Sequence, residues 1–209
     1  TLHADRAVVI NTRGGSGGGT LDTQAHTVTL AGTLSGSAAL GKAGHELRVL
    51  DLYASGFDPV MGMQERRDYH TPGLNEEPVA AQLADLRWCE GIVFVYPTWW
   101  YAQPAMLKGW LDRVWLPGVA FQIATAKERT IGGQLRNIRL FVGITTSGAP
   151  WWWLKVIGDP GRSLLMKGLR PLYARGCRRR WLQLYNMNHV SADDRTQFLA
   201  RVRRELSRL

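Results

Sequence analysis

Three aromatic residues in a row follow a short apolar segment near the middle of the chain. The segment "GIVFVYP" (91–97) ends in a proline, and after Thr98 come Trp99, Trp100 and Tyr101. Large apolar side chains usually lie inside a protein, whereas this position resembles the start of a loop. Either the rings fill a core or a dimer interface, or they form a surface for a flat ligand, which gains stacking and apolar contact from aromatic side chains.

A second aromatic cluster, "WWW" (151–153), follows another apolar segment, "IRLFVGITT" (138–146). Continuous apolar runs of this kind are typical of parallel strands that are buried on both faces. In an open parallel sheet, ligands bind beyond the carboxyl ends of the strands. Two aromatic loops at that edge therefore favour one shared flat ligand over coincidence.

Apolar runs alternate with helical patterns along the whole chain. Strands are expected at 6–10, 45–53, 92–96, 138–146 and 181–187, and the last helix is expected to begin after Ser191 as its N-cap. A weaker helical pattern covers 26–43. The polar segment 54–77 has few periodic signals and is expected to be a long connection between elements. The pattern predicts an α/β fold, a doubly wound five-stranded parallel sheet with helices on both faces, in a single domain over residues 1–209.

The chain is basic, with a formal net charge of +9, and much of the excess lies late, at 175–181 and 201–206. A solvated helix face or sheet end would explain both segments. A nucleic-acid-binding protein would rest on "RRR" (178–180) alone, without a recognition element, and is not expected.

Cysteine and histidine spacing gives no sign of a metal site. Cys89 and Cys177 lie far apart and read as reduced, buried thiols, and the five histidines show no ligand spacing, so no metal is expected. No segment approaches the roughly 18 consecutive apolar residues of a transmembrane helix. No signal peptide is visible either, so a cytoplasmic protein is the expectation.

Three motifs together resemble a known family. "YPTWWYAQPAMLKGWLDRVWLPGVAF" (96–121), "TTSGAP" (145–150) and "NHVSADDRTQFL" (188–199) are similar, in this order, to the flavodoxin-fold NAD(P)H:quinone oxidoreductases, the DT-diaphorase-like flavoproteins. The resemblance runs from about 45 to 206. It implies the flavodoxin-like form of the doubly wound sheet, a homodimer with its active site at the subunit interface, and FAD as cofactor, or FMN as in some relatives.

The resemblance also implies which residues hold the flavin. The ring-binding loop is Pro97, Thr98, Trp99, Trp100 and Tyr101, and the second flavin loop is Thr145, Thr146, Ser147 and Gly148. Backbone amides near the N1–O2 edge of the ring would stabilise charge on the reduced flavin. Arg195 falls where relatives place an arginine near the adenine of FAD; a solvent-exposed helix arginine is the equal alternative.

The first loop departs from the family pattern. Relatives have a histidine and then Ser-Phe-Asn opening the first helix, whereas this chain has "NTRGGSGGGTLDTQAHT" (11–27). With a helix start near 23–27, Thr23, Gln24, His26 and Thr27 are the expected phosphate contacts at a helix N-terminus, and Arg13 could neutralise charge. Alternatively, the glycine run is a surface insertion.

No acid or base is assigned to catalysis. Relatives place tyrosines and a histidine beside the bound quinone, and the corresponding positions here are Phe121, Ile123 and Ile157. Hydride transfer requires only that nicotinamide C4 lies about 3–3.5 Å from flavin N5. Tyr101, Trp151 and Phe121, with Lys155, are therefore expected only to shape a pocket that takes NAD(P)H and a quinone in turn.

The expected activity is the transfer of two electrons from NAD(P)H through FAD to a quinone or a quinone-like aromatic acceptor. The alternatives are an azo- or nitro-compound reductase and an ancillary flavoprotein subunit that regulates a membrane transporter. An electron-carrier flavodoxin is a further alternative, but such carriers usually present an acidic surface, which a charge of +9 contradicts.

Overall fold

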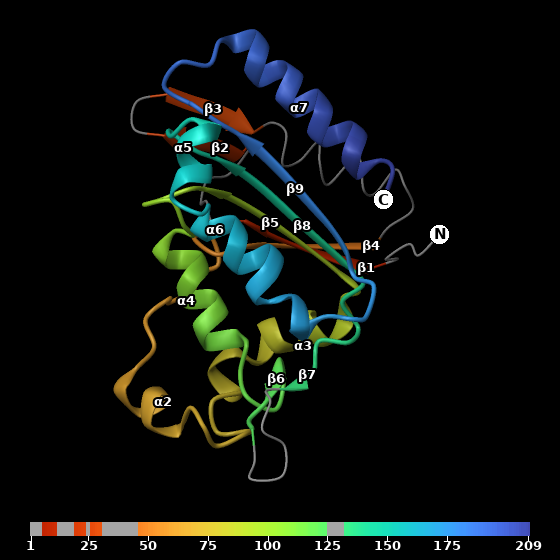
Figure 1. Ribbon diagram of the computed structural model, residues 1–209. Coiled ribbons are helices and arrows are strands. Elements are labelled where there is room, and N and C mark those ends of the chain that lie inside the picture. The colour runs from red at the N-terminus through yellow and green to blue at the C-terminus, as the bar shows by residue number, and fades with distance from the viewer. Residues whose placement is uncertain (1–5, 12–18, 24–25, 31–45, 125–131) are drawn as a thin grey trace.

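The computed structural model describes residues 6–11, 19–23, 26–30, 46–124 and 132–209 of the 209-residue chain. Its main sheet has the strand order β4-β1-β5-β8-β9 (Figure 1), and every neighbouring pair is parallel. The strands are β1 Arg6–Asn11, β4 Glu46–Asp51, β5 Gly91–Pro97, β8 Leu140–Thr146 and β9 Arg178–Leu184. This order is that of a flavodoxin-like doubly wound sheet, so the expected α/β class is confirmed.

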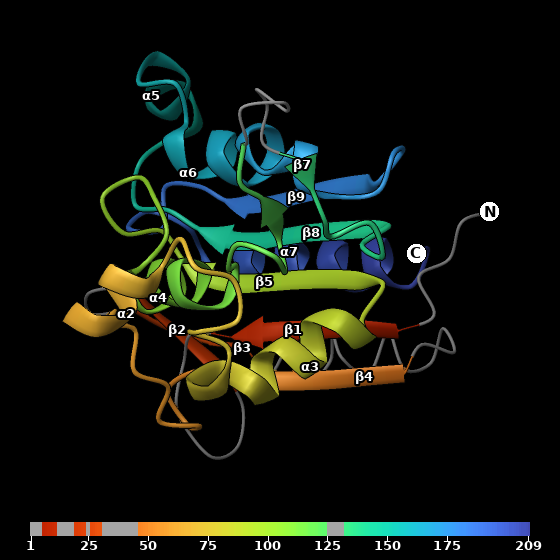
Figure 2. The same ribbon diagram turned by 90° about the horizontal axis from the view of Figure 1, so that it is seen from below.

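Helices cover both faces of the sheet (Figures 1 and 2). On one face lie α3 Ala80–Trp88, α4 Ala105–Val114 and α6 Pro160–Ser163, which continues into a π-helical turn, Leu164–Gly168; α7 Ala192–Leu206 lies on the other. Three short elements complete this part of the chain: α2 Met63–Asp68 and the 3₁₀ turns Glu77–Val79 and Arg170–Leu172. The expected N-cap is confirmed, because the Ser191 hydroxyl accepts a hydrogen bond from the Asp194 N–H at 3.1 Å.

The neighbouring strands β5 and β8 are buried except at the half-buried Pro97, because helices pack on both sides. Alternate residues of a strand face opposite ways, so Phe94 of β5 belongs to the core beneath α4, with Trp110. Its neighbour Val93 belongs to the core beneath α7, with Phe198. This double burial explains the uninterrupted apolar runs in the sequence.

The predicted helix over 26–43 is wrong at its start. Residues Gly19–Thr23 and His26–Leu30 form an antiparallel hairpin, β2 and β3, and 31–45 lie outside the described residues. The two strands contain four threonines and one valine, whose branched side chains favour extended backbone over helix. Thr23, His26 and Thr27 are therefore strand residues, and Gln24, Arg13 and 14–18 lie outside the described residues.

Smaller expectations were also tested. Cys89 is buried and Cys177 half-buried; neither takes part in a disulfide, and burial raises the pKa of Cys177 to about 11. The arginines at 178–180 begin β9, three residues before the predicted strand start. In the ranges that the structure describes, no helix is long and apolar enough to span a bilayer, and no cluster of metal-ligating side chains occurs.

Candidate functional site

The aromatic triplet after β5 forms a tight turn at the carboxyl edge of the sheet. The Trp99 N–H donates to the Ala102 carbonyl at 3.1 Å, and the Ala102 N–H donates to the Trp99 carbonyl at 2.9 Å. The two corner residues, Trp100 and Tyr101, have φ angles of 47° and 63°. Two-residue turns with positive φ at both corners strongly prefer Asn-Gly. Bulky aromatic residues are strained in this conformation, and such strain concentrates at functional sites.

Neighbouring elements hold the turn in place. The Gly161 N–H donates to the Tyr101 carbonyl at 3.0 Å, and the Gln103 side chain donates to the Gly161 carbonyl at 2.9 Å. A Cβ atom on Gly161 would lie 2.9 Å from the Tyr101 oxygen, so only glycine permits this approach. The turn is thus clamped to the start of α6.

The two aromatic clusters meet at this turn. Trp153, on α5 (Trp151–Val156), donates from Nε1 to the Tyr101 hydroxyl at 3.3 Å. Helix α5 projects from the body of the molecule (Figure 2). Trp100 is 90% exposed and Trp151 61%, so these rings are not core residues. They form an aromatic surface, as a flat ligand or a subunit interface requires.

The second predicted flavin loop lies beside the turn. The hydroxyls of Thr98 and Thr145 share a hydrogen bond of 3.0 Å, and the Thr98 N–H donates to the Thr146 carbonyl at 2.8 Å. Thr145, Thr146 and Ser147 are all buried. The Thr146 hydroxyl has no hydrogen-bond partner among the residues that the structure describes, which is rare for a buried polar group. A Cβ atom on Gly148 would lie 3.7 Å from the side-chain nitrogen of Asn188, which is an ordinary contact, so the described neighbours do not restrict this position to glycine.

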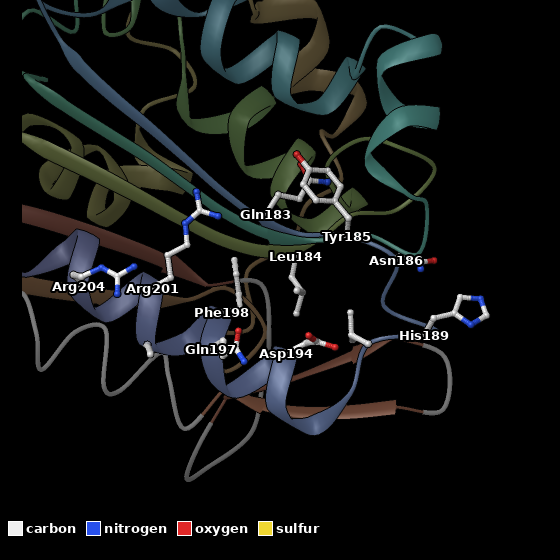
Figure 3. A pocket seen from close by; sticks show the side chains of 12 residues that line it. Gln183, Leu184, Tyr185, Asn186, His189, Asp194, Gln197, Phe198, Arg201 and Arg204 are labelled. Carbon is white, nitrogen blue, oxygen red and sulfur yellow. The ribbon is translucent and has the colours of Figure 1, made fainter.

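A groove of about 750 Å³ opens between the end of β9 and α7 (Figure 3). Gln183, Leu184 and Tyr185 line one side, and residues of α7, including Phe198 and Arg201, line the other. This volume is in the range of small-molecule sites. Its position after the last strand is the carboxyl edge, where the fold binds ligands.

Arg195 lies on α7 next to this groove. Its guanidinium donates to the Val190 carbonyl at 3.4 Å, and the side chain is half-buried. This bond attaches Arg195 to the loop after β9. The side chain is therefore not fully exposed to solvent, and its contact with the adenine of FAD stays a prediction.

Phe121 is not brought together with Tyr101 and Trp151 within this chain. It lies in β6 (Phe121–Gln122), which pairs with β7 (Gly132–Gly133), beyond the far end of α4 (Figures 1 and 2). Helix α4 starts next to the aromatic turn and runs back along the sheet, and its length carries Phe121 away from the carboxyl edge.

Several site residues were not predicted from the sequence. Trp153, Gln103 and Gly161 fix the aromatic turn, and Asn186 and His189 line the groove. Asn186 lies at the end of the last predicted strand (181–187) and His189 follows it, so the carboxyl-edge rule applied to that strand would have found them. The clamp joins residues 58 positions apart in the sequence, for which no local pattern exists.

Comparison with known proteins supports the resemblance. A protein of Escherichia coli named as an uncharacterized NAD(P)H oxidoreductase, YcaK, is 42% identical over 111 residues, which are 53% of this chain and 55% of that protein. NAD(P)H dehydrogenase (quinone) 1 of Rattus norvegicus is 27% identical over 182 residues, covering 77% of this chain and 65% of the relative. The chain therefore spans between half and two thirds of the length of these relatives.

Solved structures share the fold over nearly the whole chain. An NAD(P)H:quinone oxidoreductase of Methanothermobacter marburgensis matches with a TM-score of 0.75 and 22% identity, covering 98% of both chains. An FMN-dependent NADH-azoreductase of Bacillus anthracis, in complex with FMN, matches with a TM-score of 0.67 and 15% identity over 98% of both chains. A family model described as "Flavodoxin-like fold" matches residues 21–203. With the strand order and the site at the carboxyl edge, this match shows that the chain belongs to the family with the flavodoxin-like fold.

Proposed function

We propose that this protein is a flavin-dependent oxidoreductase that transfers two electrons from NAD(P)H to a quinone or a quinone-like aromatic compound. The observation that carries the proposal is the strained, exposed turn Trp99–Tyr101 beside the buried, unpartnered hydroxyl of Thr146. Together they offer an aromatic wall and a polar anchor at the edge where this fold binds ligands.

The residues present fit a flavin ring. When bound, a flavin supplies the capacity to take a hydride from NAD(P)H and to pass two electrons to an acceptor. The loop from Pro97 to Tyr101 would border the ring, and the segment from Thr145 to Gly148 would approach it closely, because Gly148 carries no side chain. The Thr146 hydroxyl would satisfy its missing hydrogen bond on a polar atom of the ring.

FAD is favoured over FMN by the groove beside α7. Its volume of about 750 Å³ suits an adenosine group, and Arg195 lies on the same helix. Thr23, Gln24, His26 and Thr27 are kept as proposed phosphate contacts, now through hydroxyl, amide and imidazole groups, because the hairpin supplies no helix N-terminus. The azoreductase of Bacillus anthracis binds FMN, so identification of the bound cofactor separates the two possibilities.

The acceptor and NAD(P)H would share one aromatic pocket. Tyr101 and Trp151 stand at the carboxyl edge and would stack the nicotinamide and the quinone in turn. Phe121 is remote from them in its own chain, so it would shape a pocket only in a second subunit. A homodimer with sites at the interface accounts for this separation and for the exposed aromatic rings.

The test has two parts. The cofactor of the purified protein is released by heat and identified by mass, and NADH or NADPH oxidation is then followed with and without a soluble quinone. Bound FAD and quinone-dependent oxidation are expected. Turnover of an azo dye or nitroaromatic but not a quinone would favour the alternative reductase. Bound flavin without turnover of any acceptor would favour a transporter subunit or an electron carrier, and no flavin binding would overturn the proposal.

A further inference from the structure

Three cations surround one buried carboxyl group beside the aromatic turn. Burial raises the pKa of Asp159, and the positive charges of Arg162, Lys155 and Lys167 oppose this rise. Because Coulomb interactions weaken with distance, all three cations lie near this carboxyl group. We call Lys155, Arg162 and Lys167 the cation cluster. Asp159 is the only acidic residue of the sequence between positions 129 and 192, so the cluster and its carboxyl group together carry a net positive charge.

The cation cluster adjoins the proposed aromatic pocket. Lys155 lies four residues after Trp151 on α5, and residues at this spacing share one face of a helix. Arg162 directly follows Gly161, whose N–H donates to the Tyr101 carbonyl at 3.0 Å. Helices α5 and α6, which carry these two cations, lie next to each other in both views (Figures 1 and 2). The cluster is therefore attached to the rings that we propose for stacking the nicotinamide.

The guanidinium group of Arg162 has no hydrogen-bond partner among the residues that the structure describes. Arg162 is half-buried, and the ion pairs in the described ranges join other residues. Arg113 is also half-buried, but its guanidinium donates to the Glu65 carboxylate and to the Asp58 carbonyl. A guanidinium has five N–H donors, and buried donors are normally paired. Arg162 therefore offers free donors to a ligand.

Neutralisation of Asp159 explains only part of the cation cluster. A buried carboxylate requires a compensating charge, and one cation would supply it. Three cations act on Asp159, and none of them forms an ion pair with it at 4.0 Å or less in the described part of the chain. Lys155 and Lys167 are exposed. The surplus positive charge is thus available to an anion from solution.

We infer that the cation cluster binds phosphate groups of NAD(P)H while the nicotinamide stacks in the aromatic pocket. The inference rests on the proposed function, whose electron donor carries a pyrophosphate in NADH and an additional 2′-phosphate in NADPH. Arginine binds phosphate through two parallel N–H donors, and lysine binds it as a point charge. A neutral quinone has no such group. The cluster would therefore favour the donor over the acceptor at a pocket that both use in turn.

A series of hydride donors tests the inference on the flavin-loaded protein. Reduced nicotinamide riboside has no phosphate, and NADH and NADPH have two and three. Arg162→Gln should raise KM for NADH and NADPH about tenfold, the effect of one charge-assisted hydrogen bond, and leave KM for reduced nicotinamide riboside unchanged. Lys155→Gln removes an exposed charge and should raise the same KM values about threefold. An equal rise for NADH and NADPH would assign the cluster to the pyrophosphate, and a rise for NADPH alone would assign it to the 2′-phosphate; both support the inference.

Arg170→Gln is the matched control, because it removes an exposed cation whose charge is not among those that act on Asp159. Equal effects of Arg162→Gln and Arg170→Gln would show attraction by net charge only, and an equal effect of Arg162→Gln on reduced nicotinamide riboside would show damage to the aromatic pocket. Either result overturns the inference. So would weaker binding of FAD with unchanged binding of riboflavin, which would assign the cluster to the cofactor.

Calorimetric titration with NADP⁺ separates this inference from the proposed function. Arg162→Gln should weaken NADP⁺ binding about tenfold, and Arg170→Gln should leave it unchanged. If no hydride donor were oxidised, the proposed function would fail, but a selective loss of NADP⁺ binding in Arg162→Gln would still support the phosphate site. Equal binding of NADP⁺ by Arg162→Gln and the original protein would overturn the inference whatever the turnover.

Discussion

The indole N–H of Trp153 donates a hydrogen bond of 3.3 Å to the hydroxyl of Tyr101, residues that lie 52 positions apart in the sequence. This bond joins the projecting helix α5 to the strained turn after β5. Because Tyr101 and Trp153 are 37% and 38% exposed, water can replace the bond, so its value lies in positioning the two aromatic walls of the proposed pocket rather than in stability.

Replacing Trp153 by Phe keeps an aromatic ring and removes this donor. We expect kcat/KM for a quinone to fall about fivefold, the effect of one hydrogen bond of about 1 kcal/mol, with little change in melting temperature. Tyr101→Phe should cause a similar loss, and the double variant should be no worse than either single one. Trp152→Phe is the control, since its indole N–H forms no hydrogen bond with the residues in the described ranges. Fully additive losses in the double variant would show that the bond does not position the acceptor.

The orphaned Thr146 hydroxyl gives a second prediction. Thr146→Val should leave the stability of the cofactor-free protein unchanged or slightly higher, because the hydroxyl is buried without a partner. The same change should weaken flavin binding about fivefold, measured by fluorescence titration.

Thr145→Val is the matched control at the neighbouring position. Its hydroxyl already bonds Thr98, so its removal should lower stability of the cofactor-free protein by about 1 kcal/mol. If Thr146→Val destabilised the protein as much as Thr145→Val, the hydroxyl would have a structural partner and its assignment to flavin would fail.

Much of this architecture could be predicted because its signals are local. The runs at β5 and β8 are apolar throughout since both faces are covered, and the aromatic turn follows one of them directly. The hairpin was not predicted because its glycines and threonines give only a weak pattern. The resemblance to the family then placed the start of a helix in this segment. The clamp of Gly161 on Tyr101 and the distance of Phe121 from the turn depend on tertiary packing, which no spacing in the sequence encodes.

Because the aromatic turn is strained, we expect a change that relieves the strain to raise stability and to lower flavin affinity and turnover. Changing Trp100 to Asn and Tyr101 to Gly together installs the residues that such turns prefer. We expect the free energy of unfolding to rise by about 1 kcal/mol, because positive φ angles no longer strain bulky residues. Flavin affinity and quinone turnover should fall together. Denaturant unfolding measures the first effect, and Trp152→Asn, on the adjoining surface, serves as a control. An unchanged or lowered stability would show that the turn stores no strain.

The buried carboxyl of Asp159 leads to a prediction of how stability depends on pH. This residue precedes α6 with a φ angle of 45°, is 8% exposed, and burial raises the pKa of its carboxyl above the ordinary value, although Arg162, Lys155 and Lys167 oppose the shift. Since the folded state then binds the proton more tightly than the unfolded chain, this residue lowers stability as pH rises from about 4 through the raised pKa. Asp159→Asn, which tolerates the same backbone conformation, should therefore gain melting temperature relative to the original protein as pH increases from acid to neutral.

Asp194 provides a control of opposite sign. The backbone N–H and the hydroxyl of Ser191 donate to its carboxylate at 2.9 and 2.8 Å, and these bonds lower the pKa of Asp194. The stabilisation from this carboxylate is present at neutral pH and is lost as pH falls through the lowered pKa. Asp194→Asn should thus lose melting temperature at neutral pH and match the original protein in acid. If the two asparagine variants showed pH profiles of the same sign, burial of Asp159 would not control its protonation.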